Sequence, residues 1–223
     1  MNPKINVAAV KTDAFAFNKF SWPLIWKAWE TCKEGILPVK SDLLFQWLLH
    51  GYIASDPDTW GGRLITLELG CGFSTLNFGI ASVRHSGFHI ALEDSKEYAK
   101  ICSIMLRDNK IPPMYCRIFP SPVVPLMAGE SGVYIYDGCP HISPNLVYVD
   151  GPALTDEIKV TADHYLSPCL IDGRADTVQW HRDCGHSIIE VDKEIHLACK
   201  TDKDFDVYSK FTEVVKQSGV LDS

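Results

Sequence analysis

A glycine-containing turn joins a predicted buried strand to a predicted helix in the segment Glu68-Leu69-Gly70-Cys71-Gly72-Phe73-Ser74-Thr75. At such a junction a ligand can approach the backbone and the amino end of the helix, because Gly70 and Gly72 have no Cβ to block it. Glu93 follows the next predicted strand, 21 residues after Gly72. This is near the spacing at which a carboxylate accepts hydrogen bonds from two ribose hydroxyls, so the two features together predict a site for an adenosine-bearing ligand.

The turn departs from the fingerprint of NAD-binding proteins at one position. That fingerprint continues with glycine or alanine three residues after its second glycine, where this chain has Thr75. Glu68, just before the turn, is a further difference. An NAD-dependent oxidoreductase is therefore the least favoured of the functions considered.

The segments LELGCGFST and ALEDSKEY resemble the first and second motifs of the class I S-adenosylmethionine-dependent methyltransferases. The resemblance covers about residues 64–200. It implies that S-adenosylmethionine is the cofactor, that Glu93 holds its ribose with Asp94 as a weaker candidate beside it, and that the turn lines its methionine and sulfonium end. The cofactor-binding residues predicted in and after the turn are Glu68, Leu69, Gly70, Cys71, Gly72, Ser74 and Thr75. Members of the family often place an acid or amide after the third strand to meet the adenine amine, where this chain has Phe119-Pro120-Ser121-Pro122.

Two aspartates follow later predicted strands, Asp150 in the segment 148–152 and Asp172 in the segment 170–174. Ligands in open α/β sheets bind outside the carboxyl ends of the strands, so both aspartates are predicted at the ligand-binding edge. Methyl transfer needs alignment and, for some acceptors, a base. Asp150 is the first candidate for that base and Asp172 the second. The structural alternative is an aspartate-capped turn at each position.

The ends of the same two strands are also a candidate metal site. The catechol-type O-methyltransferases hold magnesium with an aspartate after each of these strands and an adjacent asparagine, where this chain has Gly173. Hard divalent cations require several oxygen ligands, so a metal is possible here but not favoured. His181, Cys184 and His186 lie close in sequence, but their spacing fits no zinc pattern.

The elements that must position these residues alternate between strands and helices, which indicates a parallel sheet. Two strands joined by Asp192-Lys193-Glu194 predict an antiparallel edge hairpin, which agrees with the sheet of the methyltransferase family. The predicted fold is α/β, a Rossmann-like, seven-stranded and mostly parallel sheet with helices on both faces and a C-terminal antiparallel hairpin. Strands are predicted at 64–69, 89–92, 115–119, 146–149, 169–171, 187–191 and 195–199, helices from about 74 and at about 95–109, 156–165 and 175–181, and an extra hairpin within 120–144 that includes 133–136.

The rest of the chain is predicted to form one compact unit with this sheet. Residues 1–60 have Trp22, Trp26 and Trp29 and further apolar positions three or four apart, which predicts a helical N-terminal cap. Residues 61–223 form the predicted cofactor-binding domain. The tail after Asp202 is expected to be loosely held.

Composition limits the partners. The chain has 223 residues, 46% hydrophobic and 22% charged, and a net charge of −7. With no overall basic field, neither a nucleic acid nor a membrane partner is expected, and a small-molecule substrate is the simpler expectation. No signal peptide, membrane-spanning run or CxxC pair is present, so we expect a cytoplasmic protein whose eight scattered cysteines are reduced thiols.

The sequence therefore favours an S-adenosylmethionine-dependent methyltransferase that acts on an unidentified small molecule. Two alternatives stay open: a protein that binds S-adenosylmethionine without turnover, and an aminopropyltransferase-like enzyme. The latter usually has an Asp-Ser step where this chain has Asp150-Gly151. The methyl acceptor and the oligomeric state are not determined by these patterns.

Overall fold

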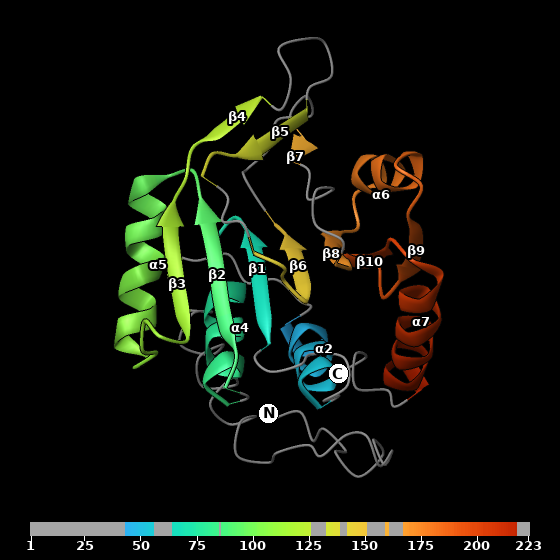
Figure 1. The fold of residues 1–223 in the computed structure, drawn as a ribbon, viewed down its shortest axis with the longest axis horizontal. Helices are drawn as coiled ribbons and strands as arrows, with labels where there is room; N and C mark the ends of the chain where they lie inside the picture. Colours follow the sequence, from blue (N-terminus) through green and yellow to red (C-terminus); the bar gives the residue numbers. More distant parts are fainter. Residues whose placement is uncertain are drawn as a thin grey trace.

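A seven-stranded sheet forms the centre of the protein in the computed structural model (Figure 1). The structure describes residues 43–55, 64–84, 86–125, 133–138, 142–150, 159–160 and 167–217. The strand order is β3-β2-β1-β6-β8-β10-β9. These strands are β1 Ile65–Leu69, β2 Phe88–Glu93, β3 Cys116–Pro120, β6 Leu146–Val149, β8 Cys169–Asp172, β9 Ser187–Glu190 and β10 Ile195–Cys199.

Strands β3, β2, β1, β6 and β8 are parallel, whereas β10 runs antiparallel to both β8 and β9. Parallel neighbours require crossover connections, and α4 and α5 supply them between β1 and β2 and between β2 and β3. In the turn between β9 and β10, Asp192 Oδ1 accepts hydrogen bonds from two backbone amides, which closes the predicted hairpin. The predicted fold class is confirmed. The helices are α2 Leu43–Ser55, α4 Phe73–Arg84, α5 Lys96–Asp108, α6 Ala175–Asp183 and α7 Asp202–Gln217.

Helices cover both faces of the sheet, because successive side chains along each strand point in opposite directions. Tyr148 of β6 packs in one buried cluster with Phe78 of α4 and Phe211 of α7. Val149, the next residue of the same strand, belongs to the cluster on the opposite face, which includes Val178 of α6. The two layers of helices thus bury the sheet between them and leave its carboxyl edge for the glycine turn.

A smaller sheet of three strands, in the order β4-β5-β7, follows β3 (Figure 1). Its strands are β4 Val123–Pro125, β5 Val133–Tyr136 and β7 Lys159–Val160. The antiparallel pairing of β4 with β5 confirms the extra hairpin. The helix predicted over 156–165 is wrong at Lys159–Val160, which pair in parallel with β5; the rest of that range lies outside the described residues. The β-branched Val160 favours a strand. The helix prediction used only the local sequence, whereas this strand forms by hydrogen bonding to the main chain of β5.

Helix α7 shows that the expectation of a loosely held tail after Asp202 was wrong. The helix is continuous over 16 residues, and the Thr201 hydroxyl accepts a hydrogen bond from a backbone amide at its start. Tyr208, Phe211 and Val215 recur three or four apart and pack against the sheet. The charged residues around this narrow apolar stripe concealed it in the sequence.

Of the segment predicted as a helical cap, 1–60, the structure describes Leu43–Ser55, which form α2 and pack on the sheet through Phe45 and Leu49. Trp22, Trp26 and Trp29 lie outside the described residues. Within the described part of the chain, no helix has the length and apolar character that crossing a bilayer would require.

Candidate functional site

The glycine turn lies at the carboxyl end of β1, between the ends of β2 and β6. Gly70 has a φ of 96°, a left-handed conformation that favours glycine, and its amide donates to the Leu92 carbonyl at 2.7 Å. Helix α4 begins at Phe73 and has no acidic side chain in its first turn, so its amino end keeps its partial positive charge. The turn therefore presents backbone amides and a helix amino end at the edge where ligands bind in such sheets.

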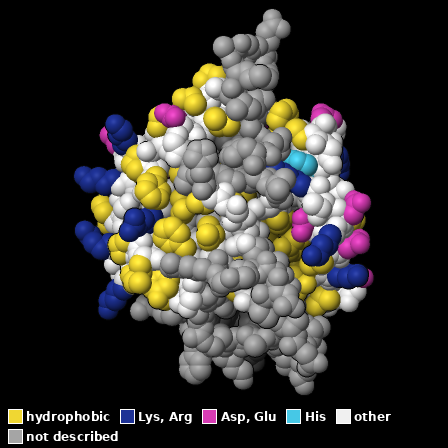
Figure 2. Space-filling view, in the orientation of Figure 1, with side chains coloured by type: hydrophobic (Ala, Val, Ile, Leu, Met, Phe, Trp, Pro, Cys, Tyr) yellow, Lys and Arg dark blue, Asp and Glu magenta, His cyan; other side chains and the backbone are white. Residues whose placement is uncertain are grey.

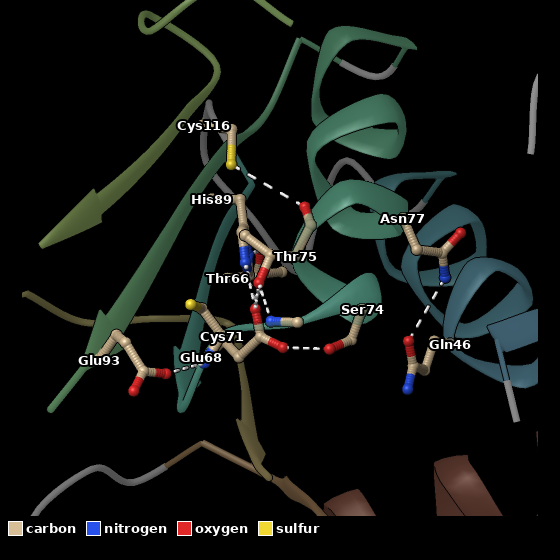
Figure 3. A network of polar contacts seen from close by, with 11 residues as sticks. Gln46, Thr66, Glu68, Cys71, Ser74, Thr75, Asn77, His89, Glu93 and Cys116 are labelled. Carbon is tan, nitrogen blue, oxygen red and sulfur yellow. Dashed lines mark hydrogen bonds and ion pairs between the residues drawn. The ribbon is translucent and has the colours of Figure 1, made fainter. Parts of the chain in front are cut away.

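Glu68 is the centre of a buried hydrogen-bond network beneath this turn (Figure 3). Its Oε1 accepts a hydrogen bond from the Ser74 hydroxyl. Its Oε2 accepts one from Thr75 Oγ1 at 2.6 Å and another from His89 Nε2 at 3.0 Å. Since the side chain is fully buried and both oxygens are engaged, Glu68 fastens the end of β1 to the start of α4 and to β2. Glu68 therefore stabilises the turn and does not face the site predicted for the cofactor.

His89 is a member of this network that the sequence analysis missed. It is fully buried in β2, its Nδ1 lies 2.8 Å from Thr66 Oγ1, and its ring stacks on Phe78 with centroids 5.0 Å apart. A carboxylate only accepts hydrogen bonds, so Nε2 is the nitrogen that donates to Glu68. The sequence did show a histidine inside an apolar strand, and a buried histidine requires a polar partner. This pattern could have predicted that His89 belongs to a buried network.

Glu93 connects the second predicted motif directly to the first. It ends β2 with 6% of its surface exposed, and its Oε2 accepts a hydrogen bond from the Cys71 amide at 2.9 Å (Figure 3). Its Oε1 accepts one from the Ser95 amide, also at 2.9 Å. Burial raises the pKa of the Glu93 carboxyl above its ordinary value of 4.5, and the hydrogen bond from the Ser95 amide acts in the opposite direction. A carboxylate held in this way still has lone pairs for further donors.

The other predicted cofactor residues surround the same turn. Thr75 Oγ1, while it donates to Glu68, accepts a hydrogen bond from the Gly72 amide at 2.9 Å. Leu69 belongs to the core, and Asp94 is exposed just beyond β2. A hydrogen bond with the Cys102 thiol, together with burial, raises the pKa of the Cys71 thiol, so this sulfur is neutral and unsuited to act as a nucleophile.

Asp150 lies next to the glycine turn. Its amide donates to the Leu69 carbonyl at 2.9 Å, and its side chain is half-buried at the end of β6. Asp172 is the last residue of β8, one strand further from β1, and its side chain lies outside what the structure describes. The fold therefore brings Asp150 next to the glycine turn and places the backbone of Asp172 at the neighbouring strand end. Their catalytic roles stay predictions.

Gly173 is required by the packing of the hairpin turn. A Cβ at this position would overlap the Lys193 carbonyl oxygen and lie 2.8 Å from the carbonyl carbon. Residue 173 therefore cannot carry the asparagine that completes the magnesium site of catechol-type enzymes. No cluster of three His, Cys, Asp or Glu side chains suited to a metal occurs in the described residues.

His181 and His186 lie near the carboxyl end of α6, on the far side of β8 from the glycine turn. Their Nδ1 atoms are 2.9 Å apart, so one of these nitrogens donates to the other. This contact links α6 to the segment before β9, and the pair lies away from the predicted cofactor residues.

Tyr136 is a second residue that the sequence analysis did not assign to the site. It extends from β5 into the cluster that contains Leu69, Leu92 and Val149, the residues at or next to the carboxyl ends of β1, β2 and β6. Its side chain is 2% exposed, and its hydroxyl has no hydrogen-bond partner among the described residues. Burial, with smaller contributions from nearby acids of which Glu93 is the largest, raises the pKa of this hydroxyl. An unsatisfied buried donor close to Glu93 is a group that a bound ligand can satisfy.

Space is also present over Gly72. Among the described residues, the atoms nearest to a Cβ built there would be Ser74 Oγ at 3.9 Å and the Tyr98 hydroxyl at 4.0 Å. An open glycine, an acidic group for ribose and an unpaired hydroxyl fit an adenosine-bearing cofactor. In the described part of the region after β3, Ser121 is not open to an adenine, because its hydroxyl donates to the Asp137 carbonyl and its amide donates to the Glu93 backbone carbonyl.

Comparisons with known proteins agree with this arrangement at the level of the fold. No protein-family model and no curated protein sequence matches the chain. A Staphylococcus aureus protein assigned as a caffeoyl-CoA O-methyltransferase matches with a TM-score of 0.50 and 13% identity, over 79% of this chain and 92% of that chain. A Bacillus cereus O-methyltransferase in complex with SAH matches at 0.44 and 12%, over 84% and 94%. The N-terminal domain of human METTL16 in complex with SAH matches at 0.47 and 11%, over 82% and 83%.

The strand order, the C-terminal hairpin and the match to the Staphylococcus aureus structure define the fold as that of the Rossmann-like class I methyltransferases. The glycine turn and Glu93 meet at the carboxyl edge of this sheet, and their binding of a cofactor stays a prediction.

Proposed function

We propose that this protein is an S-adenosylmethionine-dependent methyltransferase that acts on a small molecule. The observation that carries the proposal is the contact between Glu93 and the Cys71 amide, which joins the two predicted cofactor motifs at the carboxyl edge of the sheet. Asp150 lies beside them at the end of the adjacent strand. We also propose a cytoplasmic location, in keeping with the free thiols of the six described cysteines.

The cofactor would supply a methyl group on a sulfonium, which is already a good leaving group. The task of the protein is then mainly to bind and align. Glu93 would accept hydrogen bonds from the ribose, Tyr136 would donate its hydroxyl to the adenosine half, and Gly72 would leave room for close approach of the cofactor to the backbone. Glu68 would keep the turn in shape without touching the cofactor. Asp150 would accept the proton of an acceptor that must lose one.

The net charge of −7 and the half-buried position of Asp150 support a neutral or cationic small molecule as the acceptor. Methyl release from S-adenosylmethionine in the presence of a library of such molecules tests turnover. Acceleration by an acceptor supports a methyltransferase. Cofactor binding without methyl release by any acceptor class would favour a binding protein, and aminopropyl transfer from decarboxylated S-adenosylmethionine would favour the other alternative.

Cofactor binding is tested first with S-adenosylhomocysteine by isothermal titration calorimetry. Glu93→Gln is expected to weaken binding by about tenfold or more, because the amide offers one acceptor oxygen where the carboxylate offers two. Glu97→Gln is the matched control, since Glu97 is exposed in the first turn of α5 and its loss removes the same charge. Equal affinity of wild type and Glu93→Gln would contradict the role of Glu93, and absence of binding by wild type would contradict the proposed cofactor.

Affinity for S-adenosylhomocysteine is expected to fall as the pH is lowered through the raised pKa of Glu93. Protonation removes the acceptor, so the affinity should drop by about tenfold per pH unit below that pKa, beginning above pH 4.5. The stability of the free protein depends on pH in the opposite direction. The contribution of Glu93 to the free energy of unfolding is largest below pH 4.5 and is lost as the pH rises through the pKa of Glu93 in the folded protein. Titrations between about pH 4.5 and 8 check the prediction, and the same pH dependence in Glu93→Gln would contradict it.

Tyr136→Phe is expected to change stability and binding in opposite directions. Removing an unsatisfied buried hydroxyl should raise the free energy of unfolding of the free protein by about 1 kcal/mol. Losing a donor to the adenosine half should weaken S-adenosylhomocysteine binding by roughly three- to tenfold. Urea denaturation and calorimetry measure the two effects. Tyr148→Phe is the control, because Tyr148 is equally buried but faces the other side of the sheet. If Tyr136→Phe is more stable but binds S-adenosylhomocysteine with unchanged affinity, the hydroxyl does not contact the cofactor and Tyr136 is only a core residue.

A further inference from the structure

A groove of about 510 Å³ lies between α5 and the edge strand β3. Its apolar side chains include Leu106 from the helix, Ile111 from the connection and Ile118 from the strand. This volume is in the range of small-molecule sites. None of the residues predicted to bind the cofactor lines the groove, so it is a separate feature of the surface.

Cationic side chains line the same groove. Arg107 and Lys110 lie three residues apart at the end of α5, and Arg117 lies in β3. Residues 96–117 have five Lys or Arg side chains and two acidic ones, although the chain as a whole has a net charge of −7. Figure 2 shows several Lys and Arg side chains gathered at the left of the molecule, the side where α5 and β3 lie in Figure 1. The local potential therefore favours an anion, in contrast to the expectation from the whole composition.

An aromatic side chain completes the groove. Phe119 follows Arg117 by two positions in β3, so both side chains are on the same face of the strand. Phe119 is 42% exposed, unusual for a phenylalanine in a sheet, and it is one of the residues that line the groove. Cations next to an open aromatic ring are suited to a ligand that has both negative charge and a planar ring.

We propose that this groove binds a small phosphorylated molecule with a planar ring, of the class of the nucleoside monophosphates. Three cations match the two negative charges of a phosphate monoester, and Phe119 provides a surface on which a ring can stack. S-adenosylmethionine has no phosphate, so the proposed ligand is not the cofactor. The groove borders β3 and α5, whereas Glu93 lies at the end of β2 and is not among the residues that line the groove.

The cations of the groove also make contacts within the protein. These contacts do not prevent them from binding a ligand. Arg107 contacts Asp108 at 3.0 Å, but both side chains are largely exposed, and such pairs contribute little. A cation in the last turn also complements the dipole of α5. Arg117 donates its Nε to the Pro113 carbonyl at 3.0 Å, the one hydrogen bond of its guanidinium within the described part of the chain. Helix stabilisation does not account for Arg117 and Phe119, which belong to β3.

The test is calorimetric titration of the full chain with GMP in the presence of saturating S-adenosylhomocysteine, which occupies the cofactor site. Should S-adenosylhomocysteine fail to bind, GMP is titrated alone, so that the failure of the proposed cofactor and of this groove are distinguished. GMP is expected to bind about tenfold or more tightly than guanosine, ribose 5-phosphate or inorganic phosphate, because only GMP has both the ring and the charge. Its affinity should fall as salt rises.

The variant that tests the groove is Arg107→Gln with Lys110→Asn. Asparagine suits position 110, whose φ is 59°. The variant is expected to weaken GMP binding by about tenfold or more, and Phe119→Ala by roughly fivefold or more. The control, Lys193→Gln with Lys203→Gln, removes the same charge from exposed positions elsewhere and should leave binding within about twofold.

Three results would overturn the proposal: GMP affinity unchanged in the double variant, guanosine or inorganic phosphate binding as tightly as GMP, or no binding of GMP. An eight-nucleotide single-stranded RNA is titrated in parallel. If it binds about 100-fold more tightly than GMP and loses affinity in the same variant, a nucleic-acid strand occupies the groove and the small-molecule proposal is wrong.

Discussion

Glu68→Ala is expected to lower the free energy of unfolding by about 3–5 kcal/mol, because it leaves buried donors without an acceptor. Ser74, Thr75 and His89 all donate to this one fully buried carboxylate, and none of them can reach water without opening the junction of β1 and α4. Cofactor affinity should be lost together with the shape of the turn. Urea denaturation followed by circular dichroism, with calorimetry, measures both effects.

Glu190→Ala is the control for the loss of a carboxylate, since Glu190 is exposed in β9, and its effect should stay within about 0.5 kcal/mol. Glu68→Gln keeps the size of the side chain and one acceptor oxygen, so it should cost about 1–3 kcal/mol and provide a folded protein if Glu68→Ala does not fold. A loss below about 1 kcal/mol in Glu68→Ala would show that the network does not hold the turn.

Gly72→Arg is expected to abolish cofactor binding, by about 100-fold or more, while the free energy of unfolding changes by only about 1 kcal/mol. The reason is geometric: a Cβ at this position meets no atom of the described residues closer than 3.9 Å, and the backbone of Gly72 is not in the left-handed region. The arginine would therefore fill the space assigned to the cofactor without straining the turn. Calorimetric titration with S-adenosylhomocysteine and thermal denaturation are the two measurements.

Gly70→Ala is the contrasting variant at the same turn. Its φ of 96° makes a side chain unfavourable, so we expect a loss of about 1–2 kcal/mol in stability. The pair of variants separates the two uses of glycine, one for the backbone conformation and one for the approach of a ligand. If Gly72→Arg binds S-adenosylhomocysteine like wild type, the cofactor does not lie over this turn.

The strands of the main sheet could be predicted because residues typical of turns follow them directly in the sequence. A glycine turn follows β1, and Asp192-Lys193-Glu194 separates β9 from β10. Lys159–Val160 could not be predicted in the same way, because a two-residue strand depends on an edge of β5 that is more than twenty residues away. Helix α7 was missed for a different reason: its apolar stripe is narrow and lies among charged residues.

The candidate site was predictable where one motif defines a position, as for the glycine turn and Glu93. The partners that complete it depend on neighbouring strands. His89 is opposite Thr66 only because β1 and β2 pair in this register. Tyr136 reaches the strand ends because β5 pairs with β4 and the Ser121 hydroxyl donates to the Asp137 carbonyl. The sequence pattern also did not indicate that Glu68 faces the core and supports the turn, whereas Glu93 lies at the edge.

The close approach of Gly173 to Lys193 has a consequence for how this chain can vary. Residue 173 and the turn between β9 and β10 share one space, since the Lys193 carbonyl occupies the position of any Cβ at 173. We expect a relative with asparagine at 173 to differ in length or path across 192–194 as well. Gly173→Asn alone is therefore expected to disturb the hairpin turn, and an asparagine at this position would require a second change within 192–194.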